Sequence, residues 1–141
     1  MTDSIKKEQT FNHSIDTVWK AISIGEEISS WFLQADFKPE AGYHYTFKKI
    51  GDDCPPISGE VIEANPYKLV YTWVVNGMPT ITTVTWQLEV LNGQTRLSLE
   101  HSGISKFEGE TAVEMFNSFN GGWDNCLQGL TSYLKDAVHA G

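Results

Sequence analysis

Cysteine is scarce in this sequence of 141 residues, in which Cys54 and Cys126 are the only two. Two cysteines cannot form the disulfide framework of a small secreted domain, and no C-x-x-C pair or H-E-x-x-H motif offers the clustered ligands of a zinc site. The four histidines are scattered along the chain. We therefore expect a reduced, cytoplasmic protein without a bound metal.

Basic residues are also few, with 10 Lys and Arg against 18 Asp and Glu and a formal net charge of −8. No more than two basic residues are adjacent, so the clustered positive charge that binds phosphate is missing. This excludes nucleic acid as the expected partner and disfavours an anionic membrane surface. No apolar run reaches the roughly 18 residues of a spanning helix, so we expect no membrane insertion.

The motifs of several enzyme classes are missing as well. The sequence contains no G-x-S-x-G nucleophile elbow, and its 12 glycines form neither G-x-G-x-x-G nor a P-loop. Cys126 falls on or near the apolar stripe of a predicted helix, which favours a buried structural cysteine over a nucleophile. We therefore assign no catalytic residue and no cofactor.

What the sequence does contain is a clear change of hydrophobic period along a single unit, residues 1–141. A modest strand over residues 5–12 is followed by two short helical patterns, at 15–22 and 26–33. From residue 43 to residue 103 apolar and polar side chains alternate, which predicts an antiparallel meander with one dry face. From Glu110 to His139 the spacing returns to three and four, which predicts one long amphipathic helix. Gly121 and Gly122 interrupt its middle and indicate either a kink or the close approach of another element.

This order of elements carries a family resemblance through a set of short motifs. They are Val18-Trp19, Trp31-Phe32, Gly42, Gly59-Glu60-Val61, Pro66, Leu69, Tyr71-Thr72-Trp73, Thr95-Arg96-Leu97, His101-Ser102-Gly103, Gly122-Trp123, Leu127, Leu130 and Leu134. Together they resemble the START-like, or SRPBCC, superfamily with its helix-grip (Bet v 1-like) architecture. Within that superfamily the chain is most similar to the bacterial family named for the C-terminal domain of the activator of the heat-shock protein 90 ATPase.

The resemblance and the periodicity predict the same fold class. We expect an α+β helix-grip domain in which a curved antiparallel sheet of about six strands wraps around the long C-terminal helix, with two short helices after the first strand. The resemblance further implies an apolar cavity between the sheet and that helix.

Aromatic side chains are abundant, with 5 Trp, 5 Tyr and 7 Phe. Simple core packing explains many of them, but Tyr and Trp are also common where an apolar wall must offer a hydrogen bond to a ligand. His101 shares the inward face of its strand and is either a core histidine or a polar anchor for a ligand. The predicted ligand-binding residues are Tyr45, Tyr71, Trp73, Trp86, His101, Phe119 and Trp123, around a cavity of at least about 300 Å³.

Three functions remain open from the sequence. The first is binding of a small hydrophobic or aromatic molecule that is lipid-, polyketide- or flavonoid-like, and the resemblance places this in a stress response. The second is a polyketide cyclase or aromatase activity, for which His101 is the one candidate acid or base. The third is a co-chaperone whose partner is a heat-shock ATPase.

Overall fold

The computed structural model describes residues 4–32, 34–48, 56–65, 67–75, 77, 80–107 and 110–140. In chain order the elements are β1 (Ile5–Phe11), α1 (Ile15–Ser23), α2 (Gly25–Trp31), β2 (Gln34–Asp36), β3 (His44–Lys48), β4 (Ile57–Asn65), β5 (Lys68–Val75), β6 (Thr82–Leu91), β7 (Gln94–Ser102), the 3₁₀ turn η1 (Ile104–Lys106) and α3 (Glu110–Ala140).

The strands form one antiparallel sheet of seven strands in the order β1-β7-β6-β5-β4-β3-β2. Its two edges, β1 and β2, do not pair with each other, so the sheet is open and does not close into a barrel. The expected α+β fold class is confirmed. The sheet has one strand more than the sequence indicated, because β2 is three residues long and too short to show an alternating pattern.

Local sequence explains where several elements begin and turn. The Ser14 hydroxyl accepts a hydrogen bond from the Thr17 amide at 3.2 Å and caps the first turn of α1. Between β6 and β7, Asn92 and Gly93 have φ values of 54° and 79°, and their neighbours Leu91 and Gln94 pair directly. Two left-handed residues form the tight hairpin turn whose twist matches the flanking strands.

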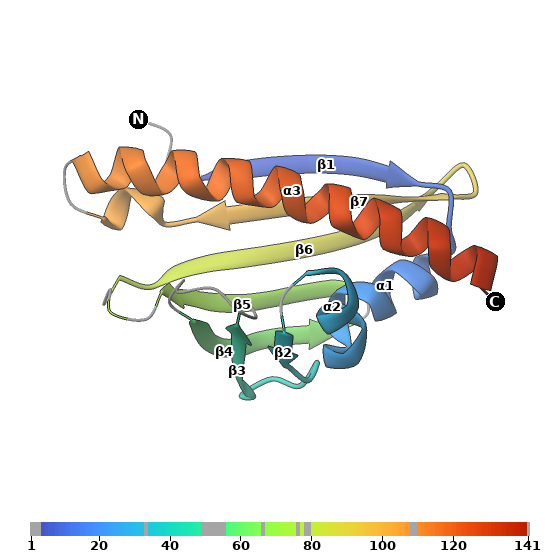
Figure 1. The fold of residues 1–141 in the computed structure, drawn as a ribbon, viewed down its shortest axis with the longest axis horizontal. Helices are drawn as coiled ribbons and strands as arrows, with labels where there is room; N and C mark the ends of the chain where they lie inside the picture. Colours follow the sequence, from blue (N-terminus) through green and yellow to red (C-terminus); the bar gives the residue numbers. More distant parts are fainter. Residues whose placement is uncertain are drawn as a thin grey trace.

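Helix α3 runs along one face of the sheet, beside β1 and β7, as Figure 1 shows. Lys7 of β1 forms an ion pair with Asp124 at 2.9 Å, and Gln9 donates to the Thr131 hydroxyl at 2.6 Å. On β7 every second side chain is buried beneath the helix, including Leu99. The hydrophobic core therefore lies between α3 and this face of the sheet.

The glycines of α3 differ in what surrounds them. A Cβ on Gly129 would lie 2.8 Å from the carbonyl oxygen of Trp31, so this glycine lets α2 pack closely against the helix. Near it, the Tyr133 hydroxyl donates to the Glu27 carboxylate at 3.0 Å. At Gly121 and Gly122 a Cβ would meet nothing within 4 Å, and the helix continues through both. The close approach that the sequence indicated at Gly121 and Gly122 is therefore not found there, and it occurs instead about two turns further along α3, at Gly129.

Trp123 is the large side chain by which α3 packs against the middle of the sheet. It is 3% exposed, and its ring centroid lies 5.2 Å from that of Trp73 and 5.8 Å from that of Trp86. We expect Trp123→Ala to reduce the free energy of unfolding in urea by about 3 to 5 kcal/mol, because it leaves a large cavity. Val113→Ala, at a 47% exposed position of the same helix, is the control and should change stability by about 0.5 kcal/mol or less. A loss below about 1 kcal/mol for Trp123→Ala would contradict the core role of this side chain.

Candidate ligand-binding site

An apolar hollow of about 230 Å³ opens between α3, the start of β4, β5 and the end of α2. We call it the α3 hollow. Its walls are Phe32, Ile57, Trp73, Ser118, Phe119, Gly122 and Trp123. Because Gly122 has no side chain, the backbone of α3 itself forms part of the wall at an exposed position. The volume is smaller than the expected 300 Å³ or more.

The walls of the α3 hollow are held in place by aromatic packing. Trp73 lies at its centre, with ring centroids 5.2 Å from Trp123 and 6.3 Å from Phe119. Phe32 stacks on Trp123 at 6.1 Å and meets Phe47 edge to face at 5.6 Å. Aromatic pairs at such distances gain about 0.5 to 1.5 kcal/mol beyond the burial of their area. The hollow is therefore bounded by side chains that are fixed by their neighbours.

His101 lies behind this wall and is completely buried. The indole N–H of Trp123 donates to its Nδ1 at 2.9 Å, and its Nε2 lies 2.7 Å from the Thr82 hydroxyl. Because tryptophan can only donate, Nδ1 must be the acceptor and Nε2 must carry the proton. The Nε2–H group then donates to the Thr82 hydroxyl, which in turn donates to the carbonyl oxygen of Trp73 at 3.2 Å.

This hydrogen-bond chain fixes the charge state of the imidazole. Burial lowers the pKa of His101 from its ordinary 6.5 to about 4. A proton on Nδ1 would also face the Trp123 N–H group, so the bond to α3 would be lost. His101 is consequently neutral near pH 7, and neither of its nitrogens is free to exchange a proton with a bound molecule.

Three other predicted site residues belong to a deeper layer that does not line the α3 hollow. The Tyr45 hydroxyl donates to the Thr72 carbonyl oxygen at 2.5 Å, and the Trp86 N–H group donates to the Tyr71 hydroxyl at 2.9 Å. Burial raises the pKa of both tyrosines, so both stay protonated. Their polar atoms have partners within the protein.

The structure thus brings Trp73, Phe119 and Trp123 to the α3 hollow and places Tyr45, Tyr71, Trp86 and His101 behind it. Sequence reasoning missed Phe32, Ile57 and Ser118 as wall residues. Phe32 and Ile57 come from the ends of elements that lie far from α3 in the sequence, and no local pattern indicates that they meet there. Gly122 carried a signal, since a glycine in a helix removes side-chain volume.

One polar atom at this site has no partner. The indole nitrogen of Trp73 is buried, and no acceptor for its N–H group exists among the described residues. The indole N–H groups of Trp31, Trp86 and Trp123 all donate to protein atoms, at 2.8 to 2.9 Å. A buried donor without an acceptor costs about 1 to 3 kcal/mol.

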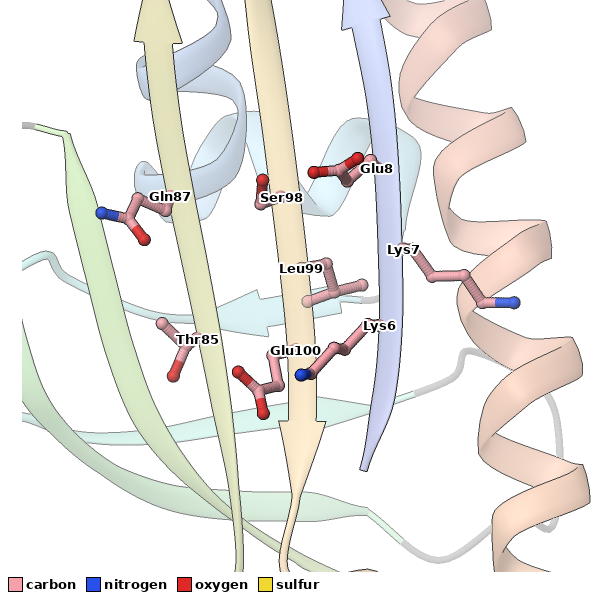
Figure 2. Close-up of a pocket in the computed structure, with 8 residues that line it drawn as sticks. All are labelled: Lys6, Lys7, Glu8, Thr85, Gln87, Ser98, Leu99 and Glu100. Atoms are coloured by element: carbon pink, nitrogen blue, oxygen red, sulfur yellow. The ribbon is translucent and has the colours of Figure 1, made fainter. Parts of the chain in front are cut away.

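A larger hollow of about 530 Å³ lies on the opposite face of the sheet, over β6, β7 and β1. Figure 2 shows its polar side chains, among them Lys6, Glu8, Thr85, Gln87 and Glu100. These groups carry charges of both signs, and Glu8 is already paired with Arg96 at 2.6 Å. Because no unpartnered buried donor or acceptor is described there, this surface is a weaker candidate than the α3 hollow.

Other kinds of site find little support in the part of the chain that the structure describes. No group of three or more His, Cys, Asp or Glu side chains in these residues could hold a metal ion. Cys126 is a buried free thiol, and burial raises its pKa. None of the described helices has the length and apolar character needed to cross a membrane.

Comparison with known proteins gives both a family and a set of shared folds. Residues 12–135 match the family model described as Activator of Hsp90 ATPase homolog 1-like protein. Protein BH1534 of Bacillus halodurans has a solution structure that is 28% identical, with a TM-score of 0.74 and alignment over 93% of this chain and 96% of that one. CalU16 of Micromonospora echinospora is 25% identical, with a TM-score of 0.74 over 97% of this chain and 79% of that chain.

Protein MLL2253 of Mesorhizobium loti is 23% identical, with a TM-score of 0.82 over 94% of this chain and 97% of that chain, and this likeness shows the fold alone. No curated protein matches the sequence.

The neutral state of His101 predicts a pH dependence of stability. In the unfolded chain His101 has a pKa near 6.5, whereas in the folded protein its pKa is about 4. The contribution of neutral His101 to the free energy of unfolding is therefore complete above pH 6.5 and is lost as the pH falls toward 4. We expect the wild-type protein to lose about 3 kcal/mol of unfolding free energy through this group between about pH 7 and pH 4. His101→Gln, which does not titrate, serves as the reference because all other groups cancel in the difference. A stability difference between the two proteins that does not change with pH would contradict the assignment.

Proposed function

The chain belongs to the family of Activator of Hsp90 ATPase homolog 1-like proteins, and from this premise we propose that it binds a small hydrophobic or aromatic molecule in the α3 hollow. The observation that carries the proposal is the hollow itself, which is walled by aromatic side chains beside the helix backbone at Gly122. Ligand sites are typically concave and mostly apolar, with few polar groups. The family match also agrees with the START-like resemblance found in the sequence.

The size of the α3 hollow limits the ligand. Sites for drug-sized molecules span about 300 to 1,000 Å³, so a hollow of about 230 Å³ suits a smaller molecule. Among the lipid-, polyketide- and flavonoid-like compounds expected from the sequence, those with one or two rings fit best. In this proposal Trp73, Phe119 and Trp123 contact the ligand, while Tyr45, Tyr71, Trp86 and His101 support the wall.

The hydrogen-bond chain favours binding over acid–base catalysis. His101 was the one candidate acid or base, and both of its nitrogens are engaged by Trp123 and Thr82. A general acid or base must lie within hydrogen-bond reach of the proton that it transfers. A cyclase or aromatase that used His101 would have to break the bond that joins α3 to the sheet.

The family description supports a second candidate, in which the domain alters the ATPase rate of a heat-shock chaperone. Mixing the purified protein with an Hsp90-type ATPase and measuring ATP hydrolysis tests this function separately from ligand binding. The cytoplasmic location and the role in a stress response that the sequence predicts remain part of the proposal.

The two neighbouring glycines of α3 provide a matched test of the α3 hollow. Gly122 lines it and Gly121 does not, while a Cβ at either position would meet nothing within 4 Å. We expect 2-acetylnaphthalene to raise the melting temperature of the wild type and of Gly121→Leu, in proportion to the logarithm of its concentration above the dissociation constant. Gly122→Leu should show little or no shift, because the leucine side chain occupies the hollow.

Both substitutions replace a helical glycine by a good helix former, so both variants should fold at least as stably as the wild type. Equal shifts in the two variants would place the ligand elsewhere. No shift in any of the three proteins, together with no binding by calorimetry, would refute binding of this ligand class.

A further inference from the structure

We propose that the α3 hollow binds aromatic amphiphiles, in which one or two rings enter the hollow and a single polar or charged group stays in water at its mouth, beside Ser118. This inference rests on the proposed function and specifies the chemistry and the orientation of the ligand. Two independent observations carry it: the walls change from buried to exposed, and the buried end has no polar atom that a ligand could reach.

The exposure of the wall residues shows which end of the hollow is open. Trp73 is 5% and Trp123 is 3% exposed, so their rings form the inner end, which we call the floor. Ser118 and Gly122 also line the hollow, but both are exposed. They lie four residues apart on α3 and therefore on the same side of the helix, where they form the mouth. A ligand thus enters along this side of α3.

The floor consists of two indole rings whose N–H groups are both out of reach. The Trp123 N–H group donates to Nδ1 of His101 at 2.9 Å. The indole nitrogen of Trp73 is enclosed by the protein, so a molecule in the hollow cannot contact it. A carbonyl, hydroxyl or charged group placed at the floor would lose its hydration without gaining a hydrogen bond, which is unfavourable. The inner part of the ligand is therefore an apolar ring.

The mouth has the opposite chemistry. Ser118 is the one polar side chain among the described residues that line the hollow, and no charged residue is among them. A ligand group beside an exposed position keeps its hydration, so the free energy of binding depends little on whether that group is neutral or charged. A second polar group at the far end of the rings would have to lie on the floor. The hollow therefore selects molecules that are polar at one end only.

Two charged naphthalenes test the orientation. They are 2-naphthyloxyacetate, an anion, and 2-(2-naphthyloxy)ethylammonium, a cation, each with its charge at one end of the same rings. We expect both to bind the wild type, by calorimetry at about 0.15 M salt, within about tenfold of the dissociation constant of neutral 2-acetylnaphthalene. Gly122→Leu should abolish this binding and Gly121→Leu should not, because only Gly122 lines the hollow.

A charge introduced at Ser118 tests where the polar end emerges. Ser118→Lys should favour the anion and Ser118→Glu the cation, so the ratio of the two dissociation constants should differ by about tenfold between the variants, after screening by salt. The matched control is Ser132, an exposed serine of the same helix that does not line the hollow. It lies 14 residues further along α3, which is about 21 Å and more than two screening lengths away. For Ser132→Lys and Ser132→Glu the ratio should differ by less than about twofold.

The outcomes separate this inference from the proposed function. If 2-acetylnaphthalene binds but both charged probes bind more than about hundredfold more weakly, the polar end of the ligand is enclosed, and the orientation is wrong while the binding function stands. If a charge at Ser118 has the same effect as a charge at Ser132, the polar end does not emerge beside Ser118 and the inference is again overturned. If none of the three compounds binds, the proposed function fails and the inference fails with it.

Discussion

The buried hydrogen-bond chain from Trp123 through His101 and Thr82 to the Trp73 carbonyl is the constraint on which the rest of this structure depends. It joins α3 to β7, β6 and β5 in a single direction, with each group donating to the next. Because every member is buried, breaking one bond leaves two polar groups without partners. The chain thereby fixes how α3 is rotated about its own axis over the sheet.

That rotation determines what the helix presents to the α3 hollow. With Trp123 directed at His101, Phe119 lies one turn earlier on the same face, and Gly122 lies beside it at the edge of the contact. The indole of Trp73 is held between these residues by ring contacts, while its backbone carbonyl is engaged by Thr82. The same interaction that stabilises the core therefore also leaves one side of the Trp73 ring facing unfilled space.

Much of the fold could be predicted from the sequence, because alternation and helical spacing are local patterns. Tyr45, Tyr71 and His101, which the alternation predicted to face inward, are buried, whereas Val90, on the inward-predicted face of its strand, is 64% exposed. The site was harder to predict, because burial does not reveal which buried polar atoms have partners. Tyr45 reaches a carbonyl oxygen 27 residues away, and the Phe32 and Ile57 walls depend on how segments distant in sequence pack together. Those features arise from tertiary packing, which a periodic pattern does not encode.

An open sheet has two edges, and each is a potential site of aggregation because unpaired backbone groups can recruit a strand from another copy. The two edge strands of the sheet, β2 and β1, reduce this risk of aggregation in different ways. At one edge β2 offers only three residues, too few to template a long ladder. At the other, β1 is seven residues long but carries Lys6, Lys7 and Glu8 in succession, so an incoming strand would have to dehydrate charges of both signs. The core between α3 and the sheet can thus be rich in aromatic residues, while neither edge of the sheet offers a long uncharged strand to another copy of the protein.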